Sequence, residues 1–473
     1  MNINDLYWVV PSTKGTGMSS LSTSAPSSPP ARTPPVAAGS FLLGSAAELR
    51  GDMLGAFLRA FERYGDAVCF RVGPPGLREI YLVFHPDAAQ RVLASSSANY
   101  RKDNVFYREV RGAFGNGILT SQDADWHRQR RFLQPLFTTR RVAEYAAAMG
   151  GQVESLVNGW RRRGAGTIDL DDEITGLTLR VVCRVLFGDD LDQALPVVRR
   201  EFGRLAEAVL RRGLAPIRMP LRWPTPVNRQ LAQARSELYS VCDQIIAQRR
   251  ASGARYGDLL GLLLDARDSD DALTDAEVRD QVLIFLLAGH ETTSTALTYA
   301  LHLLGRHPAV QERVRDEADA IAGIPTVADV PALPYSTMVL KETMRLYPSA
   351  PIISRCSLTD EDVCGYRIPA GSDLLVVPWV THRHPLFWDR PERFEPERFT
   401  PEREKARHRY AWFPFGGGPR GCIGQHFSML ESTIALAGLV QNFTFTAPVD
   451  DPPYTNHITL RPTSGVPSLV TPR

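Results

Sequence analysis

Apolar residues recur at helical spacing along most of the chain between about residues 41 and 346. The clearest helical segments are 53–64, 141–163, 229–251 and 309–322. Between about residues 352 and 379 the pattern changes to short β-branched runs separated by turn residues, and a second patch of this kind covers 457–469. The pattern therefore predicts a mainly α fold with a small β subdomain, which is an α+β architecture.

The strongest predicted helix runs from about Asp275 to Gly305. It begins with Thr274 and Glu277 at capping-box spacing, has the apolar run VLIFLLAG in its middle and ends before Pro308. Roughly thirty residues at about 1.5 Å each span about 45 Å. A helix of this length must cross the body of the protein.

The first forty residues differ from the rest in composition. From Pro11 to Ser40 they are rich in Ser, Thr, Pro, Ala and Gly, so they bury too little apolar surface to offset the entropy of ordering. From residue 41 onward the sequence shows neither an internal repeat nor a linker. We therefore interpret residues 1–40 as a disordered N-terminal arm and residues 41–473 as a single domain.

Charge, hydropathy and cysteine content bear on the binding partners and the cellular compartment of the protein. The formal net charge is +2, so no global field points to nucleic acid. The sequence contains no run of about 18 apolar residues, and we expect no membrane anchor. The six cysteines form no CxxC pair and are too sparse for a disulfide scaffold, which predicts a reducing, cytoplasmic location.

One segment near the C-terminus carries the strongest chemical signal. Residues 413–431 read FPFGGGPRGCIGQHFSMLE. The glycines allow backbone N–H groups to approach Cys422, and the amphipathic run after Gly424 predicts a helix whose positive end faces the same sulfur. A lone cysteine in a glycine-rich loop is usually an inert small residue, so the surrounding pattern decides its role.

That pattern resembles the cysteine loop of the cytochrome P450 family. The matching residues are Phe415, Gly418, Arg420, Cys422 and Gly424. The resemblance extends from Phe41 to Arg473, and it implies the P450 fold with haem b between the long helix and this loop. In that arrangement Cys422 is the axial ligand of the iron, and its anionic sulfur favours cleavage of an O–O bond.

The middle of the long helix reads AGHETT, which places polar groups in an otherwise apolar helix. The segment resembles the oxygen-binding motif of the family. This implies that Ala288 and Gly289 lie against the haem, that Gly289 lets the helix bulge, and that Glu291 and Thr292 are the catalytic acid and alcohol. The alternative is that Thr292 bonds back to a helix carbonyl and that Glu291 points to solvent.

Two further resemblances concern arginines. Glu342 and Arg345 in KETMRLYP, with Arg398 in PERF, resemble the buried ion cluster that fixes the cysteine loop in the family.

For the haem propionates, DWHRQRR nominates Trp126 and Arg130, and the family pattern adds Arg355 and Arg420. The alternative for each of these arginines is a solvated surface residue.

The resemblance implies a monooxygenase that inserts one oxygen atom from O2 into an apolar substrate of terpene, fatty acyl or macrolide-like type. The segments that line the family's substrate pocket are 99–122, 201–226, Ala288, 349–353 and the region near Ile458, and among them Phe106, Phe114, Leu221 and Ile352 favour an apolar ligand. A peroxide-driven enzyme of the same fold and a haem sensor or carrier are the alternatives, and the intact Glu291 and Thr292 argue against the first.

Electrons must come from a separate partner, which we expect to be a ferredoxin with its ferredoxin reductase or a flavodoxin-type donor. We expect the enzyme itself to be a monomer. A basic patch for an acidic partner is predicted from Arg128, Arg131, Arg403, Lys405, Arg407 and Arg409. A charge run of this kind is also compatible with a merely solvated face.

Overall fold

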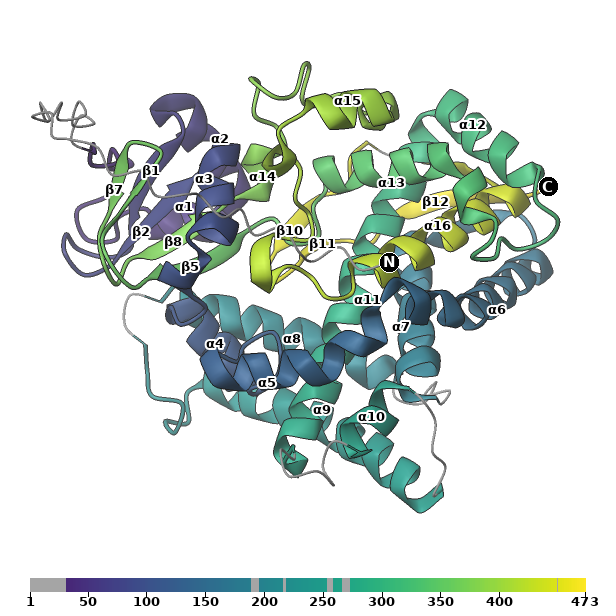
Figure 1. The fold of residues 1–473 in the computed structure, drawn as a ribbon, viewed down its shortest axis with the longest axis horizontal. Coiled ribbons are helices and arrows are strands. Elements are labelled where there is room, and N and C mark those ends of the chain that lie inside the picture. The colour runs from purple at the N-terminus through teal and green to yellow at the C-terminus, as the bar shows by residue number, and fades with distance from the viewer. Residues whose placement is uncertain (1–30, 189–194, 216–217, 253–257, 266–272, 449) are drawn as a thin grey trace, which may run out of the picture.

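The computed structural model describes residues 31–188, 195–215, 218–252, 258–265, 273–448 and 450–473. Helices make up most of this part of the chain, and the largest sheet lies at one end of the molecule, on the left in Figure 1. The predicted combination of a mainly α body with a small β subdomain is confirmed.

The helices include every segment for which the sequence predicted one. They are α1 (Ala46–Gly51), α2 (Met53–Tyr64), α3 (Pro86–Gln90), α4 (Val105–Phe114), α5 (Asp123–Leu133), α6 (Thr139–Arg163), α7 (Leu170–Phe187), α8 (Leu195–Gly213), α9 (Pro226–Ser252), α10 (Leu259–Asp265), α11 (Asp275–Arg306), α12 (Pro308–Asp319), α13 (Pro334–Leu346), α14 (Pro378–Thr381), α15 (Pro401–Ala406) and α16 (Gln425–Asn442). The four segments named above correspond to α2, α6, α9 and α12.

The strands form one larger sheet and three small ones. They are β1 (Ala67–Arg71), β2 (Glu79–Val83), β3 (Tyr100–Arg101), β4 (Gly166–Asp169), β5 (Ile353–Ser357), β6 (Glu361–Val363), β7 (Tyr366–Ile368), β8 (Asp373–Val376), β9 (Phe443–Thr446), β10 (Tyr454–Asn456), β11 (Leu460–Pro462) and β12 (Pro467–Pro472). The five-stranded sheet has the order β1-β2-β8-β5-β3, with β2 and β8 parallel and the other pairs antiparallel.

This sheet joins the two ends of the sequence, because β2 pairs with β8 and β3 pairs with β5, and both β5 and β8 follow residue 350. The sequence analysis did not predict β1 and β2. Four of the five residues of β1 are buried, and so are four of the five in β2, so neither strand shows the apolar and polar alternation of a half-buried strand. A short continuous apolar run cannot be distinguished from part of a buried helix by its periodicity.

The long helix α11 was predicted almost to the residue. Thr274 accepts a hydrogen bond from the Glu277 backbone, and the Glu277 carboxylate accepts one from the Thr274 backbone, so the capping box is complete. The helix has 32 residues, and apolar side chains of α6, α7, α8, α9 and α16 join its own in the main core. It therefore crosses the body of the protein, as Figure 1 shows.

The expected boundary of the N-terminal arm is wrong for residues 31–40. Ala37 N donates to Cys69 O and Cys69 N donates to Pro35 O, both at 2.8 Å, so this segment runs along β1. Arg32 exchanges two backbone hydrogen bonds with the β6–β7 hairpin. Composition does not report such pairing, because an edge strand is held by its backbone and tolerates proline. Residues 1–30 lie outside the described part of the chain.

Among the described residues, no helix combines the length and the apolar character that crossing a bilayer requires.

Candidate active site

The cysteine loop is held by backbone contacts on both sides of Cys422. Cys422 N donates to Phe415 O at 2.9 Å, and α16 begins three residues after the cysteine. Gly418 has a φ of +63°, and a Cβ at this position would lie 1.8 Å from Leu93 O, so both its conformation and its surroundings require glycine. The loop thus presents its cysteine in one fixed position.

The thiol of Cys422 remains accessible, whereas Cys69, Cys183 and Cys242 are buried in the core. Desolvation by the surrounding protein raises its pKa, and the backbone N–H of Gly424 together with the charge of Arg130 acts in the opposite direction. An accessible sulfur beside an N–H donor and a cation has the surroundings of a metal-binding thiolate.

Four cations surround one side of this loop. They are Lys102, Arg130 on α5, Arg355 on β5 and Arg420. Arg420 and Arg130 lie over the ring of Trp126, at 4.1 and 5.9 Å from its centroid. The sequence had nominated all of these residues except Lys102, and the structure brings them together.

Lys102 was missed because the sequence analysis nominated only arginines for the propionates. Its ammonium group is buried and donates to Leu119 O at 3.2 Å. Burial and the charges of Arg355 and Arg420 lower its pKa well below the usual value. The signal that was available is its position inside segment 99–122, which was expected to line the site.

The cation cluster has no anionic counterpart among the described residues. Burial and the charge of Arg355 lower the pKa of Arg420 to about 10, and its Nη1 is buried without a hydrogen-bond partner in the described chain. The nearby Asp123 forms its ion pair with Arg101 instead. An entering anion would compensate this buried group of like charges, so the cluster fits a ligand that carries carboxylates.

The middle of α11 carries the second group of expected site residues. Ala288 is exposed and Gly289 and Thr292 are partly exposed, although residues 281–287 and 293–305 are all buried. Ala288 and Thr292 lie about 40° apart on the helix, so they face one open volume, and Gly289 lies about 100° around the helix from Ala288. The Thr292 hydroxyl donates to Ala288 O at 2.8 Å, which is the back-bonded alternative that the sequence left open.

The expected bulge at Gly289 is not observed, because α11 is regular from Asp275 to Arg306. Instead, a Cβ at Gly289 would lie 2.7 Å from Val182 Cγ2 of α7. The glycine therefore allows α11 and α7 to approach each other closely.

Glu291 lies about 100° around the helix from Thr292 and has a different environment. Its carboxylate is buried, pairs with Arg461 and accepts a hydrogen bond from Thr459 Oγ1 at 2.9 Å. The alternative in which Glu291 simply points to solvent is therefore wrong. Glu291 also lines a polar cavity of about 430 Å³, whose other walls include Arg199 and Asp171.

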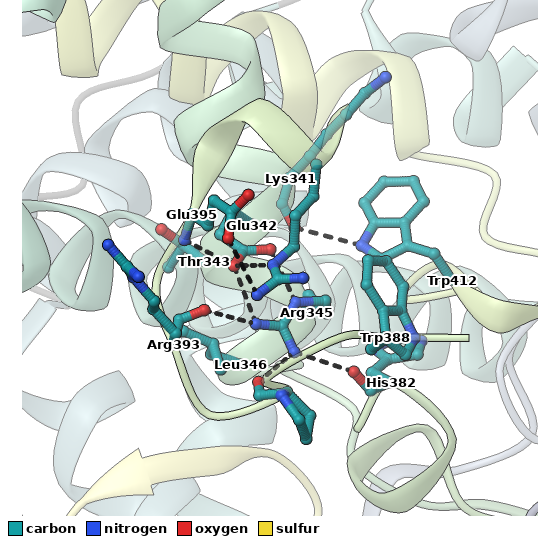
Figure 2. Close-up of polar contacts among 12 residues, drawn as sticks. Lys341, Glu342, Thr343, Arg345, Leu346, His382, Trp388, Arg393, Glu395 and Trp412 are labelled. Atoms are coloured by element: carbon teal, nitrogen blue, oxygen red, sulfur yellow. Dashed lines mark hydrogen bonds and ion pairs between the residues drawn. The ribbon is translucent and has the colours of Figure 1, made fainter. Parts of the chain in front are cut away.

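The predicted ion cluster is formed and fully buried. Glu342 holds Arg345 through two contacts of 2.7 and 2.8 Å, and Arg398 Nε lies 3.3 Å from Glu342 Oε1. The guanidinium of Arg345 also donates to three backbone carbonyls, and Trp388 lies beneath it at 5.0 Å (Figure 2). The cluster thus joins α13 to the segment that precedes the cysteine loop.

His382 links this cluster to the loop. Arg345 donates to His382 O at 3.0 Å, and the imidazole Nε2 accepts a hydrogen bond from Phe413 N at 2.9 Å. Burial and the charges of Arg345 and Arg383 lower the pKa of His382 well below its usual value, so the ring is neutral and its Nε2 is able to accept. The local sequence around His382 contains no pattern that predicts this contact.

The expected basic patch is only partly formed. Within the predicted basic patch, Arg128 pairs with Glu277, Arg403 pairs with Glu395, and Arg407 lies 3.9 Å from the centroid of Trp388. Their charges are therefore partly compensated or withdrawn from the surface.

Leu221, which was expected to line the substrate pocket, is 49% exposed and lines an open groove with Gly112 and Arg235. Phe114, by contrast, is fully buried and stacks on Phe202.

Comparisons with known proteins agree with this geometry. The family model for cytochrome P450 matches residues 34–467. Cyclooctatin synthase from Streptomyces melanosporofaciens is 37% identical over 81% of this chain and 83% of its own length, and pentalenene oxygenase from Streptomyces avermitilis is 32% identical over 83% and 87%. The crystal structure of the cytochrome P450DA heme domain superposes with a TM-score of 0.84 and 26% identity, and the match covers 94% of this chain and 99% of that one.

An accessible thiol in a rigid loop, a facing helix and a cation cluster without a counter-ion fit a haem with its two propionates. The matching family model covers most of the chain, and the named relatives include monooxygenases. The chain is therefore a member of the cytochrome P450 family, a haem-thiolate monooxygenase and thus an oxidoreductase.

Proposed function

We propose that this protein inserts one oxygen atom from O2 into a terpene, with haem b as its cofactor and electrons from a separate ferredoxin and ferredoxin reductase or a flavodoxin-type donor. The observation that carries the proposal is the similarity to relatives that act on terpene skeletons. Cyclooctat-9-en-7-ol 5-monooxygenase from Streptomyces melanosporofaciens is 36% identical over 82% of this chain, and pentalenene oxygenase is named for the same class of substrate.

The side chains near the open volume support an apolar substrate. Ala288 contributes only a methyl group from α11, and Phe106 and Ile352 are partly buried apolar side chains in the two segments expected to face it. Apolar walls bind a hydrocarbon through the loss of its water-exposed surface, at roughly 25 cal/mol per Å². A hydrocarbon skeleton of terpene type suits this lining better than a polar metabolite.

For the cofactor, we assign Cys422 as the iron ligand, with Phe415 and Gly424 flanking the sulfur. Lys102, Trp126, Arg130, Arg355 and Arg420 would hold the propionates, and Ala288 and Gly289 would lie against the opposite face. When bound, the haem supplies the activation of dioxygen.

The protein's own contribution to the reaction is the control of protons. Thr292 holds its hydroxyl proton against Ala288 O and is exposed to the open volume, so a small rotation presents that proton to a ligand there. Glu291 is placed between this helix face and the polar cavity that Asp171 also lines, and burial raises the pKa of Asp171 to about 6. A carboxyl group of this kind exchanges protons near neutral pH, so we assign the cavity as the source of protons for Glu291.

For the electron donor, we assign a docking site on the Cys422 side of the molecule. A half-open groove of about 700 Å³ lies there, with Trp126, His127, Arg131 and Pro419 among its walls. The protein is further proposed to be a cytoplasmic monomer that consists of one haem domain.

The test is a spectral titration followed by turnover. We expect terpene hydrocarbons to shift the haem absorption band of the purified holoprotein, and fatty acids and macrolides to shift it less. With NADH, a ferredoxin and its reductase, the bound terpene should acquire one oxygen atom from labelled O2, and Cys422→Ser should abolish both the thiolate spectrum and turnover. A response to fatty acids alone would contradict the substrate class, and turnover with peroxide but not with NADH would contradict the electron route.

A further inference from the structure

An open groove runs along one face of α9. Its floor consists of α9 side chains at helical spacing from Asn228 to Ala247, which is a length of about 28 Å at 1.5 Å per residue. Gly112 at the end of α4, Leu221 and Arg279 of α11 complete its walls. The groove has a volume of about 820 Å³, which lies in the range of small-molecule sites. We call it the α9 groove.

The α9 groove does not belong to the haem site. None of its wall residues is one that we assign to the haem or to the control of protons. Arg279 precedes Ala288 by a distance of about 14 Å along α11. The groove also shares no wall residue with the polar cavity beside Glu291 or with the groove beside Trp126. A ligand in the α9 groove would therefore be additional to the substrate.

Two guanidinium groups lie over the same aromatic ring in this groove. The guanidinium carbons of Arg235 and Arg279 are 4.8 and 4.5 Å from the centroid of the Tyr239 ring. The Nε atoms of both arginines are buried and have no hydrogen-bond partner among the described residues. Buried donors of this kind are satisfied when an acceptor such as a carboxylate enters beside them.

The acidic groups nearby do not balance both cations. Asp243 is the acidic residue among the described groove walls, and its carboxylate lies 3.3 Å from Arg279 Nη1 in an exposed pair, which contributes little. Asp280 is not a wall residue, and its two oxygens accept hydrogen bonds from Tyr239 Oη at 2.8 Å and from Asn116 N at 2.7 Å. The groove therefore retains an excess of positive charge.

The other walls of the α9 groove add hydrocarbon surface. Leu221, Leu231, Ala232 and Ala247 line it beside the two arginines. A small inorganic anion would leave these apolar walls uncovered, and a neutral hydrocarbon would leave the two Nε donors unsatisfied. The combination fits a ligand that has a hydrocarbon skeleton and one carboxylate.

The groove is joined to the loop formed by residues 115–122, which precedes α5. Asp280 connects Tyr239 to the backbone of Asn116 through the two hydrogen bonds given above. The next residue of α11, Gln281, accepts a hydrogen bond from Ile118 N at 3.0 Å. Helices α9 and α11 together thus fix the first half of this loop.

The second half of the same loop reaches the cation cluster of the haem site. Arg420 Nη2 donates to Ser121 O at 2.9 Å, and Lys102 Nζ donates to Leu119 O at 3.2 Å. One short segment therefore connects the α9 groove to two of the residues that we assign to the haem propionates.

We propose that the α9 groove binds an amphipathic carboxylate, which acts as an effector of the haem site. The carboxylate pairs with Arg235 and Arg279, and the hydrocarbon part covers Leu231 and Ala232. Arg235 also donates to Gly112 O at 3.0 Å, so the ligand contacts α9, α11 and the end of α4 at once and favours the arrangement in which loop 115–122 is held against α11. By linkage it tightens the binding of a ligand in the haem pocket, and that ligand tightens the binding of the effector to the same extent. The inference does not depend on the substrate or on the electron donor proposed above.

The first experiment is calorimetry of the holoprotein saturated with phenylimidazole. This azole occupies the haem pocket, so further binding takes place outside it. The probes are decanoate and decanamide, which have the same length and differ in charge. We expect one equivalent of decanoate to bind and decanamide to bind at least about fivefold more weakly, because it lacks the charged acceptor. High salt should weaken the binding of decanoate in particular.

Variants identify the groove as the site. Ala232→Glu adds a negative charge at an exposed wall position and should lower the affinity for decanoate at least about fivefold. The matched control is Gln248→Glu, which adds the same charge at an exposed position of α9 outside the groove. Arg279→Gln should lower the affinity for decanoate and leave the affinity for decanamide unchanged, which a general loss of structure would not do.

The absorption of the haem reports the coupling. In saturating decanoate, the dissociation constant of phenylimidazole should be at least about fivefold lower in the Gln248→Glu protein than in the Ala232→Glu protein. This comparison cancels any competition between decanoate and the azole inside the haem pocket. Tyr239→Phe removes the hydroxyl that is bonded to Asp280, so it should retain most of the decanoate binding and lose the gain in azole affinity.

Four results would overturn the proposal. Two concern binding, and they are equal decanoate affinities of the Ala232→Glu and Gln248→Glu proteins and equal affinities of the parent protein for decanoate and decanamide. The other two concern the effector role, and they are equal azole affinities of the two α9 variants in decanoate and a gain in azole affinity that Tyr239→Phe retains in full.

Discussion

At the scale of single residues, the position of the Thr292 hydroxyl determines what its removal does. Its hydrogen bond to Ala288 O stays within α11, so the helix does not need it. We expect Thr292→Ala to retain haem, ligand binding and NADH consumption, and to divert electrons from product to hydrogen peroxide. A tenfold change in this partition needs only about 1.4 kcal/mol.

The measurement is product formed per NADH, together with peroxide. Thr292→Ser keeps a hydroxyl and should retain most of the coupling. Full coupling in the alanine variant would show that this hydroxyl does not control the proton.

Lys102 allows a second test at this scale. One substitution is expected to stabilise the haem-free protein and to weaken the retention of haem in the holoprotein. In the haem-free protein it is buried beside Arg355 and Arg420, where burial and these two charges disfavour its charged form and lower its pKa. Lys102→Met should therefore raise the free energy of unfolding of the haem-free protein by about 1–3 kcal/mol. The same change removes a charged hydrogen bond to a propionate, so haem should be lost about tenfold faster.

Haem transfer to an excess of an apo-globin measures the second effect, and urea denaturation measures the first. Lys102→Arg should restore haem retention, and the exposed Lys405, changed to Met, is the control. A fall in stability of the haem-free variant would show that the cations of the cluster do not destabilise the haem-free protein by mutual repulsion.

At the scale of elements, the ion cluster connects α13 to the cysteine loop. Glu342, Arg345 and Arg398 are all buried, so removal of one charge leaves the others uncompensated. We expect Glu342→Gln to lower the free energy of unfolding by about 3–5 kcal/mol and to weaken the thiolate spectrum. The matched control is the partly exposed pair of Lys341 on α13 and Glu404 on α15, where Glu404→Gln should cost less than about 1 kcal/mol. Equal effects in urea denaturation would contradict the assignment.

His382 gives the same connection a pH dependence. In the folded state the ring is neutral, whereas in the unfolded chain it becomes protonated below about pH 6.5. The unfolded state therefore binds the extra proton, and the free energy of unfolding falls as the pH decreases through that value. This group contributes a slope of up to about 1.4 kcal/mol per pH unit. In His382→Asn, whose side-chain carbonyl still accepts from Phe413 N, the slope between about pH 6.5 and 5 should be smaller. The exposed His426, changed to Asn, is the control, and an unchanged slope for His382→Asn would contradict the account.

The same elements show what the sequence predicts and what it cannot. The ends and the apolar middle of α11 are local signals, so the helix was predicted closely, and the motif around Cys422 identified the loop without any structure. The role of Lys102, by contrast, depends on its proximity to Arg355, which lies some 250 residues away in the sequence. The pairing of β1 with residues 35–37 is made by backbone groups, which no side-chain pattern predicts. Local periodicity reports which face of an element is buried, but it does not report the partner.

At the scale of the whole molecule, the sheet ties the start of the chain to its C-terminal third. Strand β2 pairs in parallel with β8, and β5 in the same sheet carries Arg355. The segment that follows residue 31 first contacts the β6–β7 hairpin and then covers the outer edge of this sheet along β1. Its pairing therefore supports, through the sheet, one of the cations that we assign to the propionates.

Two truncations test that role. Removal of residues 1–40 eliminates the four backbone hydrogen bonds that join this segment to β1 and to the β6–β7 hairpin, two at Arg32 and two between Cys69 and residues Pro35 and Ala37, all at 2.8 Å. It also eliminates the two local backbone bonds between Ser40 and Gly44. At about 0.5–1.5 kcal/mol net for each of the four bonds to β1 and the hairpin, we expect this variant to lose about 2–6 kcal/mol of unfolding free energy relative to a variant that lacks only residues 1–30. Because both variants lack residues 1–30, their difference reports on residues 31–40 alone. The measurement is urea denaturation of the two holoproteins, with haem retention as the second readout. Equal stabilities would show that the pairing along β1 contributes nothing, and in that case the arm boundary expected from composition would describe the energetics better than the backbone contacts do.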